Sequence, residues 1–381
     1  MSTRPPRIAI DGHTLGRRAG GNESYVLGLL EGLARIGYDG EVVLYLSRDA
    51  PTPDPGRLAV LHHRLRSRGS LRRLLVELPS ALRRDRPDFA HFQYVGPPRS
   101  PCPVTIAIHD TSFLDAPGLL PRAMAIRLRG TTGWAVGRAA AVMVPSAWTA
   151  RNLAAAYPDA IGKIHVVPLA PPSAMSPANA PGVAATDGPG NAIPRSALPD
   201  RFCLYVGRRQ RRKNVAFLLR AYAAARTIDG DVPPLLLLGP AGPEDAALQR
   251  LVSELGVADA VLLRGFASAE MLAAAYRRAD IFCYPCRYEG FGLPLIEALA
   301  SGCPALAADE GGLPETLGEA GRLLRPQSVS AWADALVELT RDAAARQELA
   351  RRGPKQARKF SWAHTAEGWL AAARAAGIPQ V

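Results

Sequence analysis

The sequence predicts an α/β protein built from two doubly wound parallel sheets. Short aliphatic and β-branched runs alternate with longer Ala-, Leu- and Arg-rich segments that suit helices, a pattern typical of parallel strands joined by crossover helices. The series stops at a Pro- and Ala-rich segment, 171–199, and then starts again. With 381 residues, of which 48% are hydrophobic, the chain is long enough for about two or three domains with buried cores.

The first half is assigned to a domain at 1–170. Its predicted strands lie at 7–11, 41–46, 88–92, 103–109, 141–144 and 163–168. Helices are predicted in the gaps between them, at 23–36, 71–84, 122–139 and 147–156. This alternation predicts one sheet covered by helices.

The segment 171–199 contains hardly any large apolar residue. We predict a flexible linker here, because such a segment cannot bury enough surface to order itself. A second domain is predicted at 200–358, with strands at 202–206, 235–238, 261–263, 281–284, 304–307 and 322–324. A last helix, at 361–376, carries Trp362 and Trp369. Ligands of doubly wound sheets bind beyond the carboxyl ends of the strands, so a cleft between the domains is the expected site.

The chain carries an excess of positive charge, most of it in the first half. Lys and Arg number 46 against 34 Asp and Glu, for a net charge of +12. Residues 1–170 hold 22 of the basic and 13 of the acidic residues, a net +9, which leaves 24 against 21, a net +3, for the rest. An anionic partner is therefore expected, such as a nucleotide, a nucleic acid or a lipid surface.

Much of this charge lies at residues 57–86, where nine arginines face only Glu77 and Asp85. The arginines are Arg57, Arg64, Arg66, Arg68, Arg72, Arg73, Arg83, Arg84 and Arg86. Leucines at 71, 74, 75, 78 and 82 recur at helical spacing, which predicts an amphipathic helix on an anionic membrane surface. A buried leucine stripe with solvated charges is the alternative. Nucleic acid is not expected as a partner, because no aromatic residues alternate with these arginines.

The composition also predicts a cytoplasmic protein in peripheral contact with the inner face of the cell membrane. No window approaches the roughly 18 apolar residues that span a bilayer, and the chain runs from Met1 into the first strand without a signal-peptide core. The five cysteines are sparse and odd in number, so we expect buried thiols. Cys283 and Cys286 are expected to be structural, because no second pair accompanies them.

The most informative segment is 288–297, YEGFGLPLIE, which follows a predicted strand and opens a helix. Pro294 suits a first turn, and Gly290 and Gly292 let a ligand approach the backbone where unpaired amides favour an anion. Glu289 precedes the helix, and Glu297 is expected in its first turn. Both carboxylates are expected to face one crevice. An ordinary helix start and a pair of glycosidase carboxylates are the alternatives.

Three further segments lie at predicted strand ends. The loop 207–214 carries five basic residues, of which Arg208 and Lys213 suit a diphosphate, while Arg209 and Arg211 are interpreted as solvated charges. The loop containing Gly20 and Gly21 lacks the Gly-x-Gly-x-x-Gly spacing of a dinucleotide site, but it allows a phosphate or sugar to approach. His109 ends an apolar strand, with binding and structural roles weighted equally.

Together these segments resemble the retaining glycosyltransferases of family 4, which have the GT-B architecture of two Rossmann-like domains facing across a cleft. The closest likeness is to bacterial mannosyl- and rhamnosyltransferases of surface-polysaccharide assembly. The matching features run in order from residue 8 to about 325. They are Gly20-Gly21, His109-Asp110, Val144-Pro145-Ser146, KIHVVP at 163–168, Gly207-Arg208 with Lys213-Asn214, the Glu289-x7-Glu297 block and Gly311-Gly312-Leu313-Pro314-Glu315.

The resemblance implies a catalytic set of four side chains. Arg208 and Lys213 would hold the diphosphate of a nucleotide-sugar donor, Glu289 would contact the transferred sugar, and His109 would contact it near the reacting centre. Glu297 would bind the ribose hydroxyls. The other residues implied in donor binding are Gly290, Phe291, Gly292, Leu293, Gly20, Gly21, Arg264 and Phe266. Asn22 and Glu23 depart from the family's pattern, in which a small apolar residue and a glycine are usual at the acceptor loop.

The implied activity is transfer of a hexose, with mannose from GDP-mannose favoured, to a glycan or lipid-linked acceptor. No cofactor and no metal is expected, and the Asp229-Gly230-Asp231 segment is interpreted as a turn. The helix at 361–376 would pack back on the first domain. Two alternatives stay open: a sugar-nucleotide epimerase on the same fold, and a non-catalytic peripheral membrane protein with a vestigial nucleotide site.

Overall fold

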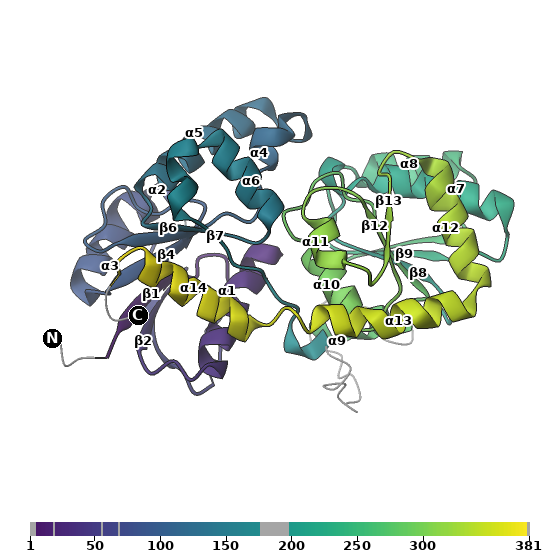
Figure 1. Cartoon of the computed structure of the whole chain (residues 1–381). Helices are drawn as coiled ribbons and strands as arrows, with labels where there is room; N and C mark the ends of the chain where they lie inside the picture. Colours follow the sequence, from purple (N-terminus) through teal and green to yellow (C-terminus); the bar gives the residue numbers. More distant parts are fainter. Residues whose placement is uncertain (1–4, 18–19, 55, 68, 176–197, 379–381) are drawn as a thin grey trace. The chain divides into compact units, whose positions relative to one another are not determined.

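A computed structural model of the protein describes residues 5–17, 20–54, 56–67, 69–175 and 198–378. The chain forms two compact units. Unit 1 comprises Met1–Ala170 and Phe360–Val381, and unit 2 comprises Pro171–Lys359. Each unit is a doubly wound sheet in which the described strands pair in parallel (Figure 1). The predicted fold class is confirmed.

Unit 1 contains, within its described residues, a seven-stranded sheet in the order β3-β2-β1-β4-β5-β6-β7. The strands are β1 Arg7–Asp11, β2 Glu41–Leu46, β3 Ala59–Arg64, β4 Phe89–Gln93, β5 Val104–Ala107, β6 Ala141–Val144 and β7 Ile164–Val166. All except β3 are predicted from the sequence, with slightly different ends. The sequence does not reveal β3 because it is an edge strand with largely exposed side chains, so it lacks the continuous apolar run of a buried parallel strand.

Helices cover both faces of this sheet (Figure 1). They are α1 Gly21–Arg35, α2 Ser70–Arg72, η1 Arg73–Glu77, α3 Leu78–Asp85, α4 Ser112–Asp115, η2 Pro117–Leu119, α5 Arg122–Arg138, α6 Ala147–Ala156, η3 Pro158–Lys163 and α14 Trp362–Ala375. One core cluster joins α3, α5 and α6 to the strands, whereas α1 and α14 pack together on the other side of the sheet.

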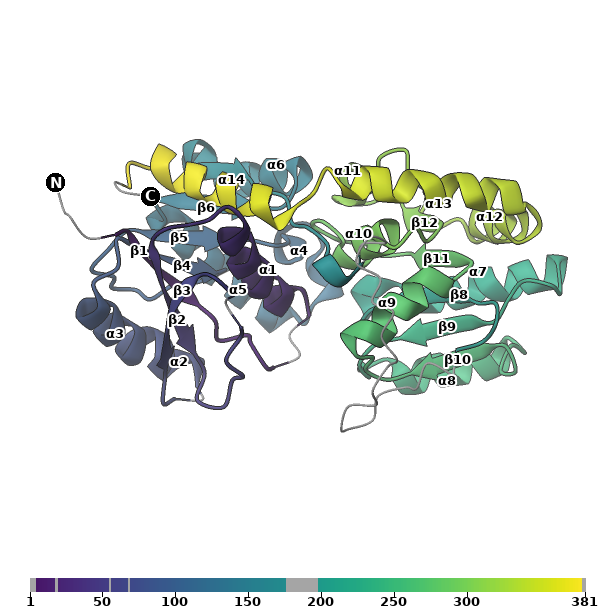
Figure 2. The ribbon, with the colours of Figure 1, turned by 90° about the horizontal axis from the view of Figure 1, so that it is seen from below.

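The last helix, α14, lies along α1 (Figure 2). Gly28 and Gly32 of α1 make this approach possible, because a Cβ atom at Gly28 would lie 2.0 Å from the Trp362 ring and one at Gly32 would lie 2.1 Å from the Trp362 carbonyl oxygen. Trp369, on the same helix, is fully buried, and its Nε1 donates to His91 Nδ1 over 3.1 Å. Helix α14 is therefore a structural part of unit 1.

The arginine-rich segment differs from its prediction. The single helix expected at 71–84 is three consecutive elements, α2, η1 and α3. Arg73 is not a surface charge: its side chain is buried and forms an ion pair with Asp11 at the end of β1. Leu78 and Leu82 belong to the core cluster, as the alternative interpretation expects.

Unit 2 contains, among its described residues, a six-stranded sheet in the order β10-β9-β8-β11-β12-β13. The strands are β8 Cys203–Val206, β9 Leu235–Leu238, β10 Val261–Arg264, β11 Ile281–Tyr284, β12 Ala305–Ala308 and β13 Arg322–Leu324. The helices are η4 Ser173–Met175, η7 Arg211–Lys213, α7 Val215–Ile228, α8 Asp245–Glu254, α9 Ala269–Arg278, α10 Leu293–Ala300, α11 Leu313–Leu317, α12 Val329–Arg341 and α13 Ala343–Ala357. Helix α7 packs with α8 and α12, and α10 packs with α9, α11 and α13.

The predicted linker at 171–199 falls mainly on residues 176–197, which lie outside the described residues. Just before them, η4 packs on α9 and α10, where Ser301 Oγ donates to the Met175 carbonyl oxygen over 3.2 Å. Over the described parts of the chain, no helix has the length and apolar character needed to cross a membrane.

Replacing Trp369 by alanine is expected to lower the free energy of unfolding by about 3–5 kcal/mol, because the change leaves a cavity beneath α14 and removes the donor to His91. Chemical denaturation followed by circular dichroism measures this effect. Trp134→Ala is the matched control, since Trp134 is 41% exposed, and a change within about 0.5 kcal/mol is expected there. Equal losses in both variants would contradict the structural role of α14.

Candidate functional site

The carboxyl ends of β8 and β11 in unit 2 carry a cluster of charged groups around Glu289. Lys213 Nζ lies 3.1 Å from each carboxylate oxygen of Glu289 and donates to the hydroxyl of Tyr284 over 2.7 Å. Tyr284 in turn donates to Glu289 Oε1 over 3.2 Å. Arg212 Nη1 contacts Glu289 Oε2 and donates to the Tyr288 carbonyl oxygen over 2.9 Å. Two predicted residues, Glu289 and Lys213, are thus brought together by the fold.

Local backbone geometry positions this cluster. Lys213 ends the short helix η7, and Asn214 then adopts a left-handed conformation, φ 57°, before α7 begins. On the other side, Gly312 N donates to the Glu289 carbonyl oxygen over 2.8 Å. A Cβ atom at Gly311 would lie only 2.3 Å from that oxygen. The predicted Gly311-Gly312 segment therefore allows the loop after β12 to hold Glu289 in place.

Burial and charge act against each other at Glu289. Burial alone would raise the pKa of its carboxyl, but Lys213 and Arg212 lower the pKa below the ordinary value through their charges, and hydrogen bonds from Lys213 and Tyr284 add to this effect. Glu289 is therefore ionised at neutral pH. Nearby, burial raises the pKa of the Cys286 thiol to about 11, so this cysteine is neutral and fits its expected structural role.

Helix α10 begins at Leu293, shortly after Glu289. Its N-cap is Gly292, at φ 92°, and Pro294 occupies the first turn, as predicted. A Cβ atom at Gly292 would lie 2.6 Å from the Leu313 side chain. The donor-binding candidates Gly290, Phe291 and Leu293 surround this cap and are buried. The helix start therefore presents backbone amides at the same strand ends as the charged cluster.

The prediction that Glu297 lies in the first turn of α10 is wrong. The helix begins at Leu293, and Glu297 is one turn further along. It is buried, and its Oε2 accepts a hydrogen bond from the Tyr276 hydroxyl over 2.9 Å. Burial raises the pKa of Glu297 to about 7. The two carboxylates of the Glu-x7-Glu block thus differ in charge near neutral pH, because only Glu289 has cations beside it.

The loop after β8 contains a second departure from prediction. Arg208 is exposed, as a donor-binding side chain would be, but Arg209 is buried rather than solvated. Arg209 forms two hydrogen bonds with Asp245, at 2.9 and 2.8 Å, and donates to the carbonyl oxygens of Gly239 and Arg264 over 3.1 and 3.0 Å. Arg209 therefore ties the loop after β8 to the loop after β9 and to the end of β10.

The remaining predicted residues of unit 2 lie at the end of β10. Arg264 is the last residue of that strand, and Phe266 follows two residues later with 46% of its surface exposed. Arg211 is exposed, as expected. The donor-binding candidates of this unit other than Glu297, which lies within α10, are thus found at or just after the carboxyl ends of β8, β10 and β11.

The candidates of unit 1 lie at the corresponding edge of its own sheet. Gly20 is the N-cap of α1, at φ 61°, and Gly21 is the first helical residue; both are exposed. Glu23, which departs from the sequence pattern of the family, has a structural role. Its Oε1 accepts a hydrogen bond from Gly16 N over 2.7 Å and so closes the loop after β1. His109 follows β5 and lies edge-on to the ring of Tyr25, with ring centroids 4.7 Å apart.

A hydrogen-bond chain determines the tautomer of His109. Gln93 Nε2 donates to the Asn22 carbonyl oxygen over 3.0 Å, so the Gln93 amide turns its Oε1 toward His109 Nε2, 2.9 Å away. An amide oxygen can only accept, so the Nε2 of His109 carries the proton. Burial lowers the pKa of His109 to about 4, against an opposing effect of Asp110. His109 is therefore neutral, with its lone pair on Nδ1.

The sequence alone does not identify four residues of these clusters as part of a site: Arg212, Tyr284, Gln93 and Asn22. Arg212 was visible as one of five basic residues in its loop, and Gln93 ends a predicted strand. Nothing in the sequence pairs either of them with its partner, because the contacts join residues that are 77 and 16 positions apart.

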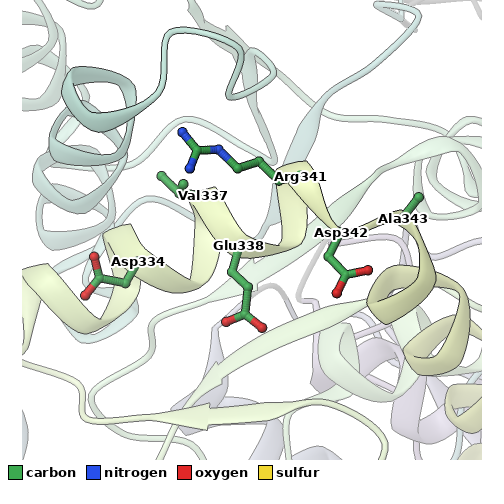
Figure 3. A pocket seen from close by; sticks show the side chains of 6 residues that line it. All are labelled: Asp334, Val337, Glu338, Arg341, Asp342 and Ala343. Atoms are coloured by element: carbon green, nitrogen blue, oxygen red, sulfur yellow. The ribbon is translucent and has the colours of Figure 1, made fainter.

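Two other features of unit 2 lie away from these strand ends. A hollow of about 650 Å³ on α12 is lined by Asp334, Val337, Glu338, Arg341, Asp342 and Ala343 (Figure 3). Arg341 pairs with Asp229, which lies between α7 and β9 at the edge where strands begin. The hollow is largely acidic and sits at the wrong edge for a diphosphate. Asp231 N donates to Asp229 Oδ1 over 3.0 Å, consistent with the predicted turn.

Comparison with family models gives two matches that together cover most of the chain. The model described as Glycosyltransferase Family 4 matches residues 19–170, and the model described as Glycosyl transferases group 1 matches residues 192–356. The first match lies in unit 1, and the second lies within unit 2.

Two curated relatives show the same relationship. The D-inositol 3-phosphate glycosyltransferase of Nocardia farcinica is 41% identical over 175 residues, 44% of this chain and 38% of that protein. The O-antigen chain mannosyltransferase B of Escherichia coli is 36% identical over 162 residues, 42% of either chain. The chain thus spans about two fifths of the length of the curated relatives it matches.

Solved structures with the GT-B fold resemble the whole chain. A sucrose-phosphate synthase from Thermosynechococcus elongatus has a TM-score of 0.72 at 22% identity, over 97% of this chain and 98% of its own. The Anabaena protein HepE, in complex with UDP and glucose, has a TM-score of 0.64 at 16% identity, over 96% and 98% of the two chains. At these identities the likeness concerns the fold.

His109 is expected to stay neutral, with its proton on Nε2, from about pH 5 to pH 8, because burial lowers its pKa to about 4. Two-dimensional NMR of protein labelled with ¹⁵N-histidine measures the tautomer and the pKa directly. Gln93→Glu should raise the pKa of His109 by at least one unit, roughly, since an anion at this position favours imidazolium. Gln356→Glu, at an equally buried glutamine of unit 2, should leave the His109 titration unchanged; an identical titration in both variants would contradict the assignment.

Proposed function

Because the chain belongs to the family 4 glycosyltransferases of GT-B fold, with a group 1 domain in its second half, we propose that it is a retaining hexosyltransferase. It moves a hexose from a nucleotide-sugar donor to a glycan or lipid-linked acceptor. The observation that carries this proposal is the meeting of Lys213, Arg212 and Glu289 at the start of α10. These groups combine cations for a diphosphate with a carboxylate for sugar hydroxyls.

The cations have a role when the donor arrives. An ammonium or guanidinium group that contacts a carboxylate can also contact a phosphate oxygen, because both are anionic acceptors. Lys213 and the exposed Arg208 would hold the leaving diphosphate, assisted by the amides near Gly292. Negative charge grows on that diphosphate as the bond to the sugar breaks, so these donors stabilise the transition state more than the bound substrate.

Glu289 and His109 would orient the sugar. Glu289 stays ionised because Lys213 and Arg212 lie beside it. Its carboxylate can therefore accept hydrogen bonds from sugar hydroxyls and stabilise the positive charge that develops on the sugar ring. His109 is neutral, and its Nδ1 lone pair accepts from a hydroxyl without adding charge. The leaving phosphate takes the proton of the acceptor hydroxyl. This arrangement places no demand on a metal ion, since Lys213 and Arg208 supply the positive charge at the diphosphate.

We propose GDP-mannose as the donor and surface-polysaccharide assembly as the setting. The E. coli relative, named for mannosyl transfer to the O-antigen chain, supports the sugar. The UDP and glucose in the HepE complex support a nucleoside diphosphate sugar in general.

A lipid-linked acceptor would require contact with an anionic membrane surface, and we propose residues 57–86 for this contact. Leu71, Leu75 and Val76 are exposed on α2 and η1, by 70%, 50% and 59%. The exposed arginines that surround them include Arg72, Arg83 and Arg84. Arg73 is excluded because it is buried against Asp11.

Glu289→Gln is expected to reduce the rate of transfer from GDP-mannose by about 10²–10³-fold, because the neutral amide cannot stabilise the positive charge that develops on the sugar ring in the transition state. Product formation with an added glycan acceptor measures the rate. The glutamine keeps the size of the side chain, so folding is expected to survive, and Glu338→Gln, at an exposed ion pair with Arg322, should retain full activity.

Near wild-type turnover of Glu289→Gln would contradict the proposal. Product analysis without acceptor separates transfer from epimerisation, since an epimerase converts the donor alone. Nucleotide binding without transfer or donor hydrolysis would identify a vestigial site.

GDP-mannose affinity is expected to rise between pH 6 and pH 8, because the pKa of Glu297 is about 7 and only the carboxylate accepts fully from two ribose hydroxyls. Calorimetric titration measures this dependence, and Glu297→Gln should bind more weakly with little change across the same pH range. A flat profile in the unmodified protein would contradict a role for Glu297 in ribose binding. Thermal shifts with GDP, UDP, dTDP and ADP identify the base, with the largest shift expected for GDP.

A further inference from the structure

The loop after β1 carries a histidine that the candidate site does not use. His13 lies two residues beyond the end of this strand, and its side chain is 26% exposed. Its ring Nδ1 lies 3.0 Å from Asp11 Oδ2, and its backbone N donates to Asp11 Oδ1 over 3.2 Å. The same carboxylate pairs with Arg73, a buried residue 62 positions further along the chain. His13 is thus attached to a buried ion pair at the carboxyl end of β1.

The Asp11 carboxylate determines which ring nitrogen of His13 carries a proton. Burial alone would raise the pKa of Asp11, but the charges of His13 and Arg73, and hydrogen bonds from both, hold that pKa well below its ordinary value. An ionised carboxylate can only accept hydrogen bonds, so Nδ1 of His13 is the donor. In the uncharged ring the lone pair is then on Nε2. Arg73 balances the charge of Asp11 in either form of His13.

The Nε2 atom of His13 is available to a ligand. Within the residues that the structure describes, this atom makes no hydrogen bond. The backbone that carries the ring is held in place, because Ser47 Oγ donates to the His13 carbonyl oxygen over 3.2 Å and Gly12 N donates to the Tyr45 carbonyl oxygen over 2.8 Å. A ligand would therefore meet a hydrogen-bond acceptor that is already oriented.

Hydrogen bonds connect the loop of His13 to His109. Thr14 Oγ1 donates to the Asn22 carbonyl oxygen over 3.3 Å, and Gln93 Nε2 donates to the same oxygen over 3.0 Å. Gln93 Oε1 in turn accepts from His109 Nε2 over 2.9 Å. The two histidines thus come from one edge of the unit 1 sheet and offer lone pairs on different nitrogens, Nε2 of His13 and Nδ1 of His109.

We propose that Nε2 of His13 accepts a hydrogen bond from a hydroxyl group of the acceptor sugar, next to the hydroxyl that attacks the donor. The attacking hydroxyl gives its proton to the leaving phosphate, whereas its neighbour keeps its proton and can donate it to His13 throughout the reaction. His13 is therefore a specificity residue, and Asp11 and Arg73 are positioning residues. An anionic group is a poor ligand for Nε2, because the Asp11 carboxylate lies directly behind the ring.

The inference rests on the proposed function for the identity of the acceptor as a sugar. Transfer from GDP-mannose to methyl α-D-mannopyranoside and to its monodeoxy analogues tests it. In the unmodified protein, removal of the neighbouring hydroxyl should lower kcat/KM by about tenfold, because one hydrogen bond is lost. The loss should appear in KM, since this contact is made equally in the bound substrate and in the transition state.

Two variants of His13 separate its two ring nitrogens. In His13→Asn the amide nitrogen can replace Nδ1 as donor to Asp11, but no atom remains at the position of Nε2. This variant should lose about tenfold with the parent mannoside and nothing further with the analogue that lacks the neighbouring hydroxyl. In His13→Gln the amide oxygen reaches further and can accept from the hydroxyl, so part of the discrimination should return.

His364→Asn is the matched control, at an exposed histidine of α14, and should discriminate among the mannosides as the unmodified protein does. An equal loss in His13→Asn with the parent mannoside and with every analogue would indicate a merely structural role and overturn the inference. Discrimination that survives unchanged in His13→Asn would also overturn it.

NMR of protein labelled with ¹⁵N-histidine gives a readout that does not depend on activity. The His13 signals, identified by their absence from His13→Asn, should show the proton on Nδ1, and methyl α-D-mannopyranoside should shift the Nε2 signal. A proton on Nε2, or an Nε2 signal that the mannoside does not shift, would overturn the inference. An unmodified protein that shows both features but transfers no mannose would contradict only the proposed function.

Discussion

The candidate site of unit 2 depends on one constraint: a half-buried carboxylate must remain charged. Glu289 meets this constraint because Lys213 and Arg212 reach it from the loop after β8. Their approach in turn requires the left-handed turn at Asn214 and the close packing of Gly311 on the Glu289 backbone. An ion pair away from solvent is costly when one partner is missing. The ion pairs of Glu289 with Lys213 and Arg212 therefore depend together on the turn at Asn214, on the packing of Gly311 and on the start of α10.

In unit 1, two histidines are held in place by neutral partners rather than by ion pairs. His91 is buried and His109 is half-buried among aromatic rings, and the loss of solvent around each ring lowers its pKa. Neutral partners then determine their tautomers: Gln93 accepts from His109, and Trp369 donates to His91. Trp369 belongs to helix α14 and contacts His91. His91 in turn contacts Tyr25, whose ring packs on His109. The packing of α14 is therefore linked to the position of His109.

The positive charge of the chain is divided between structure and surface. Arg73 and Arg209 are buried, and each pairs with a carboxylate of another element, whereas Arg212 belongs to the Glu289 cluster. The arginines of α5 are exposed, in the half of the chain that carries most of the net charge. Net charge alone therefore does not describe the binding properties of this protein, since burial decides which arginines a partner can reach.

The sequence alone determined the fold class, most strands and the catalytic candidates, because parallel strands need apolar runs and ligand loops need glycines at strand ends. It could not reveal β3, whose exposed edge lacks such a run, nor the burial of Arg73 and Arg209. It also could not assign Arg212 and Gln93 to their partners. Only the tertiary structure decides these points, since burial and ion pairing are made by residues far apart in the chain.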